Sequence, residues 1–343
     1  MLYILLFIFF LTALFAMLED RLEEQTRNVM FLVVCFLAAL AAGLRPDDVD
    51  HDYLNYVSMY YEDFNIMTEV SFLFISSLVH LLFDNYIFIF IIYAFLSLAL
   101  NARALKIQTD LLFLSILVFF STYYLTHTMN QIRVAVSCGI FLCSIPYLKS
   151  GQRLKYVLMV VCATLFHYSA FVLIAAVFFR EKAMSRIEYF IWCSIIPFCY
   201  LLYMAHVDPF VMIPIPYFEK KMEAYELLQK SVGERVNPFN LVLMVKIVIL
   251  YFIIWKSQLI ESFNDKVYLY IKIEILSISS LLLLSNIPVV AFRINELYGV
   301  VEILLFPLVF YTIRPNWLGK AVVVAMAFVL FVINVFYNQQ IFV

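Results

Sequence analysis

The stretch that decides the fold is residues 110–149, which read DLLFLSILVFFSTYYLTHTMNQIRVAVSCGIFLCSIPYLK. Between Asp110 and Lys149 the run is apolar enough for a membrane, with a single arginine, Arg133, set inside it. A guanidinium among so many Phe, Leu and Ile side chains costs several kcal/mol unless it has partners or faces a wet cavity. An ionisable group in such a place therefore indicates a functional site.

The composition of the whole chain agrees with this stretch. The chain is 65% hydrophobic and 14% charged, with a mean hydropathy of +0.95, whereas soluble domains carry about a quarter charged residues. This predicts an all-α polytopic membrane protein. Since a bilayer core about 30 Å thick needs roughly 20 apolar residues per helix, residues 1–343 are expected to form a single integral membrane domain with about 11–12 transmembrane helices.

Cysteine usage gives no sign of a bound metal. The six cysteines all fall inside predicted spans and lack CxxC or Cys/His ligand spacing, so they are expected to act as small buried hydrophobes. Nucleophile elbows, Gly-rich phosphate loops and basic nucleic-acid patches are also missing from the sequence. We therefore expect no metal, no cofactor and no nucleic acid as a partner.

The basic residues orient the spans. We expect spans at about 2–18, 29–44, 86–100, 110–126, 130–148, 155–166, 168–180, 187–204, 239–255, 267–287, 296–313 and 319–337. With these spans, the short basic loops alternate onto one side, which the positive-inside rule assigns to the cytoplasm. Those loops contain Arg21/Arg27, Arg103/Lys106, Lys149/Arg153/Lys155, Arg180/Lys182/Arg186, Lys256/Lys266 and Arg314/Lys320.

Two segments decide whether this alternation holds. Residues 70–83 are apolar but only about 14 residues long, so we interpret them as an outward interfacial or re-entrant helix that does not span. Residues 155–180 fit either one helix of about 39 Å or two short arms that meet near His167. The charge rule favours two arms, because a single helix would invert everything downstream.

On this topology the outward polar material lies mainly in two loops, at about 45–85 and 205–238, with a short link at 286–296. In the second loop, Met222, Tyr225 and Leu228 recur every three residues, which suggests an amphipathic helix over 219–228 on the outer surface. That helix would be either a solvated element packed on the bundle or a lid over a substrate.

The first outward loop concentrates acids and tyrosines directly after a predicted span. Asp52 and Glu69 are the leading candidates for a general base toward a sugar hydroxyl, with Tyr53 and Tyr56 as sugar-binding walls. The alternatives are a solvated loop, a carboxylate that only pairs with an arginine, or a divalent cation site. The last lacks the spacing of a calcium loop.

Three arginines fall at outward span ends, away from the cytoplasmic basic belt: Arg45, Arg133 and Arg293. Brought together, they would form an anion clamp, because the guanidinium fork binds phosphate bidentately and stays charged. A lipid diphosphate fits such a clamp. The alternative is that each arginine snorkels to headgroups or pairs with an acid, as Arg293 could with Glu296 at i+3.

His167 lies in the string LFHYSA at the tip of the proposed short hairpin. A first arm of about 12 residues rises only about 18 Å, so the imidazole would sit below the outer surface, where only a polar cavity suits it. It is a candidate acid, base or hydrogen-bond donor. The alternative is a structural histidine that caps a broken helix.

Taken together, these motifs resemble the EpsG/Wzy-like family of bacterial polysaccharide polymerases over about residues 40–180. The resemblance is carried by Gly43-Leu44-Arg45, Asp52-Tyr53-Leu54-Asn55-Tyr56, Glu69 before a short apolar helix, Gln131-Ile132-Arg133, and Phe166-His167-Tyr168-Ser169-Ala170, with Arg293 and Tyr298 similar to the family's later site. The sequence departs from the family at Tyr53 and Leu54, and at Val134, where the family commonly has Gln.

The resemblance implies a metal-independent membrane glycosyltransferase that joins repeat units carried on undecaprenyl diphosphate at the outer, periplasmic face of the bacterial inner membrane. Any likeness to GT-C glycosyltransferases is by analogy only. The implied catalytic residues are Asp52, Glu69, Arg133, His167 and Arg293, and the implied substrate-binding residues are Arg45, Tyr53, Tyr56, Asn130, Gln131, Tyr168, Glu296 and Tyr298. The implied partners are the lipid-linked glycan, the bilayer and a chain-length regulator protein.

Two other functions stay open at this point. The same arginines and His167 would suit the central site of a flippase or transporter for a lipid-linked oligosaccharide, although the sequence contains no paired inverted repeats. A ligase or another polyprenyl-dependent transferase is the nearest alternative among enzymes.

Overall fold

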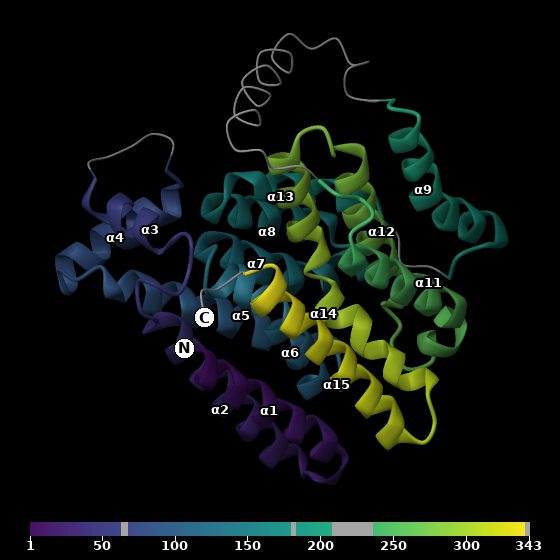
Figure 1. Cartoon of the computed structure of the whole chain (residues 1–343), viewed down its shortest axis with the longest axis horizontal. Coiled ribbons are helices and arrows are strands. Elements are labelled where there is room, and N and C mark those ends of the chain that lie inside the picture. The colour runs from purple at the N-terminus through teal and green to yellow at the C-terminus, as the bar shows by residue number, and fades with distance from the viewer. Residues whose placement is uncertain (63–67, 180–182, 208–235, 340–343) are drawn as a thin grey trace. The chain divides into compact units, whose positions relative to one another are not determined.

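The computed structural model describes residues 1–62, 68–179, 183–207 and 236–339, and every regular element in these ranges is a helix (Figure 1). This confirms the prediction of an all-α polytopic membrane protein. Within the described ranges seven helices are long and apolar enough to cross a bilayer: Leu2–Arg21, Glu24–Gly43, Ile87–Gln108, Ile132–Lys149, Arg186–Met204, Leu241–Glu261 and Asn316–Tyr337.

Seven is fewer than the expected 11–12 spans, because several expected spans are short or broken. The apolar run after Asp110 forms α6 (Leu112–Ser121) and then a π-helical turn, η2 (Tyr124–Thr128), before α7 (Ile132–Lys149). π-Helical turns of this kind occur often at functional sites. Here the turn directly precedes the helix that carries Arg133.

The helices of the chain fall into two compact units. Unit 1 comprises residues 1–178 and 302–343, and unit 2 comprises residues 179–301. The residues of the first outward loop, the Arg133 helix and the His167 hairpin all belong to unit 1.

The frame of unit 1 is a row of packed helices. α2 (Glu24–Gly43) packs on α5 (Ile87–Gln108), α5 packs on α7, and α7 packs on α8 (Arg153–Phe166). Two glycines permit this close packing, since a Cβ on Gly43 would lie 2.9 Å from Ile91 Cα and one on Gly139 would lie 2.7 Å from Leu100 Cβ. The position of Arg133 therefore depends on the tight α5–α7 contact at Gly139.

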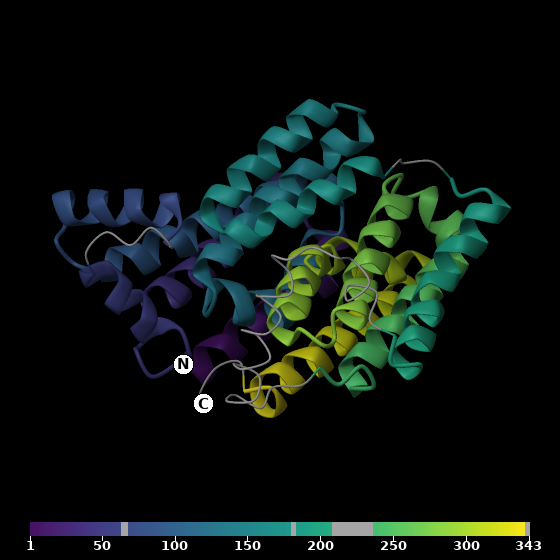
Figure 2. The same cartoon turned by 90° about the horizontal axis from the view of Figure 1, so that it is seen from above.

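A helical hairpin follows α7, as the charge rule favoured. α8 ends at Phe166, His167 has an extended backbone (φ −152°, ψ 115°), and the 3₁₀ helix η3 (Tyr168–Phe178) returns beside α8 (Figure 2). The hydroxyl of Tyr156, near the start of α8, donates a hydrogen bond to Leu173 O at 2.5 Å. Residues 155–180 are thus not one continuous helix, and His167 is the residue at the break.

The first outward loop folds into two short helices that lie side by side, α3 (Tyr53–Tyr61) and α4 (Val70–Leu82) (Figure 1). α4 has 13 residues, about 20 Å in length, which is too short for a full span and matches the non-spanning helix that we predicted. It buries Phe72, Ile75 and Val79 on one face and exposes Phe74, Leu81 and Leu82 on the other. This apolar outer face suits contact with lipid.

The remaining elements of unit 1 close around α6. The N-terminal α1 (Leu2–Leu18), with a terminal 3₁₀ turn η1 (Glu19–Arg21), and α15 (Asn316–Val332) both pack on α6. α14 (Glu302–Leu305) and the 3₁₀ helix η4 (Phe306–Thr312) precede α15 in the chain. The π-helical turn η5 (Ile333–Tyr337) follows α15 directly. Asn334 Nδ2 donates to Ser121 O at 2.9 Å, which joins the last helix to the end of α6.

Unit 2 is built on α12 (Val267–Leu283), which packs against α9 (Arg186–Met204), α11 (Leu241–Glu261) and α13 (Pro288–Gly299) (Figure 1). Local signals set its helix starts. Ser185 and Glu188 form a capping box at α9, the Asn240 side chain caps α11, and Pro288 begins α13. The amphipathic helix expected at 219–228 lies outside the described residues.

Candidate active site

Three predicted site residues from distant parts of the sequence meet in unit 1. The carboxylate of Glu69 forms an ion pair with Arg133 through Oε2, and its Oε1 lies 3.0 Å from Nδ1 of His167. The side chains are 6%, 21% and 11% exposed for Glu69, Arg133 and His167 respectively. We call these three residues the Glu69 cluster.

Each member of the cluster sits at an end of a helix. Glu69 is the residue before α4, Arg133 is in the first turn of α7, and His167 follows the last residue of α8. Backbone direction changes at these ends, so side chains from three helices can point at one place.

Two hydroxyl groups hold the helices of the cluster in place. Ser137, one turn after Arg133, donates to Ala163 O on α8 at 2.9 Å and also lies 3.2 Å from Arg133 O. At the hairpin tip, the hydroxyl of Tyr168 donates to the carbonyl of Thr68 at 3.2 Å. The residues before Glu69 and after His167 are therefore tied to one another, which fixes the distance between these two side chains.

Aromatic rings cover the arginine. The Arg133 guanidinium carbon lies 5.3 Å from the centre of the Tyr56 ring and 5.9 Å from that of Phe72. Tyr93 lies next to Phe72, with ring centres 6.2 Å apart. Such rings stabilise a cation by their quadrupoles, and they lower the local dielectric around it.

The charges of the cluster are balanced at Glu69. Burial alone would raise the pKa of Glu69, but the hydrogen bond with His167 and the charge of Arg133 outweigh burial and lower it. Burial raises the pKa of Tyr56 to about 12, against the opposing charge of Arg133. At neutral pH Glu69 is thus an ionised carboxylate, and the neighbouring Tyr56 is a protonated phenol.

Two polar atoms of the cluster lack a protein partner. Arg133 Nε and His167 Nε2 are buried without a hydrogen bond to any described residue. Buried polar atoms are almost always satisfied by protein groups, water or a ligand. Here both exceptions belong to side chains that could engage a ligand.

Arg45 has a different setting from Arg133. It forms an ion pair with Asp50 in which both side chains are 0% exposed, and its Nη1 donates to Ala42 O at 2.7 Å. Its guanidinium carbon lies 4.6 Å from the centre of the Phe90 ring. Burial raises the pKa of Asp50, and the charge of Arg45 opposes this rise. This ion pair holds the loop after α2, and Arg45 Nη2 is buried without a hydrogen bond to any described residue. A direct role of Arg45 toward a ligand stays a prediction.

The predicted sugar-binding tyrosines lie between the two arginines. Tyr53 stacks on Phe90 at 4.3 Å between ring centres, and Tyr56 meets Phe90 edge-on at 6.2 Å. Both tyrosines are 4% exposed. They form a wall inside the protein, and their ring faces are not open surfaces.

The other predicted residues of unit 1 lie close by in sequence. Asp52 precedes α3, where its Oδ1 accepts from Asn55 Nδ2 at 3.3 Å. Asn130 is buried and Gln131 is half-buried in the turn that leads into α7. Tyr168 is 45% exposed. No hydrogen bond or ion pair between Asp52 and the Glu69 cluster is found among the described residues.

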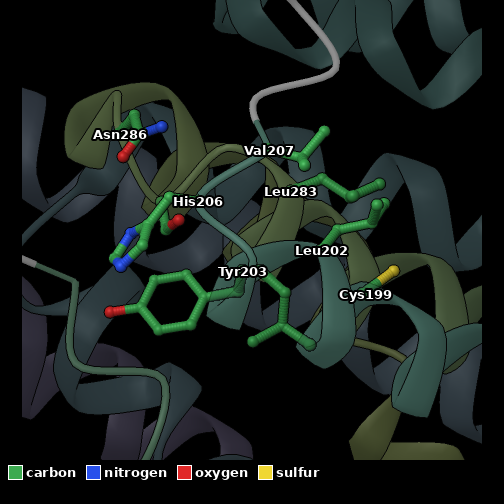
Figure 3. Close-up of a pocket in the computed structure, with 9 residues that line it drawn as sticks. Cys199, Leu202, Tyr203, His206, Val207, Leu283 and Asn286 are labelled. Carbon is green, nitrogen blue, oxygen red and sulfur yellow. The ribbon is translucent and has the colours of Figure 1, made fainter.

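The later predicted site belongs to unit 2. On α13, Arg293 is exposed, Glu296 is half-buried and Tyr298 is 2% exposed. The meeting of Arg293 with Arg133 remains a prediction. Unit 2 also has a pocket of about 120 Å³, in which the imidazole of His206 and the ring of Tyr203 lie at one end with Asn286 (Figure 3). Residues 208–235, which follow His206 and Val207, are outside the described part.

Sequence reasoning missed the residues that support the cluster. Phe72 and Tyr93 could not be singled out in a chain with 35 Phe and 23 Tyr. Ser137 had a signal, because a serine at i+4 from a key helical residue shares its face. No group of three or more His, Cys, Asp or Glu side chains suited to hold a metal occurs among the described residues.

Fold and cluster together define a multi-pass membrane protein with a charged site at its helix ends. The chain belongs to the EpsG family, whose model matches residues 28–342. This confirms the resemblance noted from the motifs. The chain is also 25% identical over 196 residues to the amylovoran biosynthesis protein AmsC of Erwinia amylovora, a match that covers 52% of each protein. No solved structure matches the chain.

Proposed function

We propose that this protein is a polysaccharide polymerase, a membrane glycosyltransferase that joins oligosaccharide repeat units carried on undecaprenyl diphosphate. Membership of the EpsG family and the likeness to an amylovoran biosynthesis protein support a role in making polysaccharide. The observation that carries the proposal is the Glu69 cluster, because it combines a cation for a leaving phosphate with groups able to move a proton.

The reaction is a displacement at the anomeric carbon of the donor. A hydroxyl oxygen of the acceptor repeat forms a bond to that carbon, the bond to the diphosphate oxygen breaks, and its electron pair leaves with the lipid diphosphate. The hydroxyl proton passes to a base in the cluster or to Asp52. Every atom is accounted for without a redox partner.

Arg133 is the residue proposed to bind the diphosphate. Its guanidinium is part-exposed, and of its five N–H donors one is directed at Glu69. Negative charge grows on the leaving oxygen in the transition state, and a fixed cation in a site of low dielectric stabilises that charge. Arg293 is proposed as a second ligand for the diphosphate, with Glu296 and Tyr298 beside it. Arg45 supports the site through its ion pair with Asp50.

The site is proposed to face the periplasm or exterior of the bacterial inner membrane. The basic loops that the positive-inside rule places in the cytoplasm include Arg153, at the start of α8, and α8 runs from there to His167 at the opposite end. A chain-length regulator would be a partner on the outer side.

The direct test is reconstitution. Purified full-length protein in lipid vesicles is given undecaprenyl-diphosphate-linked repeat units, and the products are separated by gel electrophoresis. We expect a ladder of lengthened glycans from the wild type and no ladder from Arg133→Ala. Arg153→Ala, which removes an exposed arginine from the far end of α8, is the matched control and should give the normal ladder.

A test in cells separates the polymerase from the alternatives. Loss of a polymerase leaves single repeats exported, whereas loss of a flippase leaves lipid-linked repeats on the inner side. Loss of a ligase leaves long lipid-linked chains that are never transferred. Either of the last two outcomes would overturn the proposed function.

A further inference from the structure

We propose that His167 is the general base that takes the proton from the acceptor hydroxyl, through its Nε2 atom, and that Glu69 is the positioning residue that holds its ring. This inference rests on the proposed function, since it assigns a role within that reaction. It selects one base from the three candidates that the sequence offers, which are Asp52, Glu69 and His167.

The contact at Nδ1 fixes the tautomer. An ionised carboxylate can only accept hydrogen bonds, so the 3.0 Å contact requires that Nδ1 of His167 carries the proton and donates to Oε1 of Glu69. In the neutral imidazole the lone pair is then on Nε2. A histidine oriented by a carboxylate at one nitrogen presents a base at the other nitrogen, by the same logic as in catalytic triads.

The surroundings of Nε2 fit this role. That atom is buried and makes no hydrogen bond with any described residue. A buried ring nitrogen without a protein partner is available to a ligand or to water. Here the backbone N–H of His167 already bonds to Ala163 O at 3.0 Å, so the ring is not needed to end α8.

Glu69 is poorly placed to be the base itself. Oε1 is bound to His167 and Oε2 to Arg133, so both oxygens are occupied by donors. These donors lower the pKa of Glu69, which makes the carboxylate a weaker proton acceptor. Asp52 contacts only residues near it in sequence within the described hydrogen bonds.

One carboxylate thus joins the two halves of the reaction. Arg133, on one oxygen, is the proposed ligand of the leaving diphosphate, and His167, on the other oxygen, receives the proton of the attacking hydroxyl. The imidazolium that forms is stabilised by Glu69, and it then releases its proton to water. The separation of base and anion site is therefore set by the width of a single carboxylate.

The test compares two variants with a matched control in the reconstituted assay, using the full-length protein and lipid-linked repeats from pH 5 to 9. His167→Gln can still donate to Glu69 but has no basic nitrogen. Glu69→Gln keeps the shape of the side chain and removes its charge. His80→Gln removes an imidazole whose Nε2 lies 3.0 Å from Tyr60 O. His80 is in the last turn of α4, at the opposite end of this helix from Glu69.

We expect His167→Gln to lower kcat by about 10²- to 10⁴-fold, with a change in KM of less than about threefold. The wild-type rate should fall on the acid side as an imidazole takes up a proton, and this limb should be absent in His167→Gln. Glu69→Gln should keep the limb but lower kcat, by about 10-fold or more, because the ring loses its orientation. His80→Gln should keep the wild-type rate and profile.

The pH profile is needed because other charged and titratable groups lie in and around the Glu69 cluster. Glu69 contacts His167 directly, and Arg133, Tyr56 and Tyr93 interact with Glu69. Only the loss of the acid limb on removal of the imidazole assigns that limb to His167. A variant that lowers the rate merely by loosening the helices would retain it.

Several results would overturn the inference. A wild-type rate or an unchanged acid limb in His167→Gln would exclude His167 as the base. A Glu69→Gln variant that loses the limb while His167→Gln keeps it would make Glu69 the base. Melting temperatures of the purified variants show whether they fold. If His167→Gln does not fold, His167→Asn is assayed in its place, with the same expected rate and pH profile. If the wild type itself makes no polymer, the proposed function fails, whatever the variants do.

Discussion

Glu69 and His167 are separated by 98 residues in sequence, yet Oε1 of the first lies 3.0 Å from Nδ1 of the second. Glu69 stands immediately before a short apolar helix, and His167 stands at the break in a helical hairpin. Neither position lies within a membrane-spanning helix. The site is therefore built from helix ends, which the long spans hold at fixed places.

Two replacements of Arg133 should distinguish the effect of its positive charge from the effect of its planar guanidinium shape. Arg133→Ala should lower polymer formation by at least about 10²-fold, the usual effect of removing a preorganised charge at a developing anion. Arg133→Lys should recover only part of this loss, since an ammonium lacks the planar fork that pairs with Glu69 and with phosphate. Initial rates in the vesicle assay measure both. Equal rates for Lys and Arg would contradict a bidentate role.

Asp52→Asn should have a small effect, less than about 10-fold on the rate. The carboxylate accepts a hydrogen bond from Asn55 Nδ2, and the amide oxygen of asparagine can accept the same bond. The backbone N–H of residue 52, which donates to Asp50 Oδ1, is unchanged by the substitution. The measurement is the same assay at saturating donor. A loss as large as that of His167→Gln would show that the loop moves Asp52 into the reaction.

The ion pair of Arg45 and Asp50 should matter for stability more than for chemistry. Removing one partner, as in Arg45→Ala, leaves a buried unpaired charge and should destabilise the protein by about 3–5 kcal/mol. The double variant Arg45→Leu with Asp50→Leu should cost less, because no charge remains buried. Equilibrium unfolding in detergent micelles compares the three proteins. Equal destabilisation by the single and double variants would argue against the ion pair as the cause.

The lowered pKa of Glu69 predicts how stability depends on pH. Because the folded-state pKa lies below the ordinary value of 4.5, the ion pair and hydrogen bond contribute their full stability above about pH 4.5. That contribution is lost as the pH falls through the lowered pKa. Melting temperatures of wild type and Glu69→Gln should thus differ by a constant amount near neutral pH and converge at acid pH. A difference that grows toward acid pH would have the wrong sign.

The topology can be tested with single cysteines in a background without native cysteines. Ala183→Cys lies between the hairpin and α9, in a loop that the charge rule places in the cytoplasm, and it spares the Ser185 capping box. An impermeant thiol reagent added outside cells should not label it. Leu54→Cys, on the exposed side of α3, should be labelled. The opposite pattern would invert the proposed orientation.

The sequence was enough to predict the kind of fold and the three members of the Glu69 cluster. Apolar length predicts a membrane helix, and an ionisable residue set inside an apolar run is unusual, so the sequence singles out Arg133 and His167. Glu69 was one of two candidate carboxylates in the first outward loop. The contacts between them could not be predicted, because they depend on where α8 breaks and on how closely α5 and α7 approach at Gly139.

Burial of the aromatic residues also escaped prediction. Tyr53 and Tyr56 belong to a loop rich in polar residues, which suggested open rings, but α3 packs them against Phe90 and Phe72. Arg45 is fully buried and Arg133 is part-exposed, because Arg45 pairs with Asp50. Asp50 was one of several aspartates in the same loop, so this pairing could not be predicted. When several residues of the same type lie in one loop, the packing of that loop decides which of them forms the ion pair.

The length of α8 has a consequence for which molecules can react. Its 14 residues give a rise of about 21 Å, against about 30 Å for a bilayer core, so a hairpin entered from the cytoplasm would end inside the outer leaflet. A diphosphate on a lipid is held near this depth by its tail, whereas a free sugar nucleotide stays in water. The short helix would thus select substrates by their anchor before any sugar is recognised.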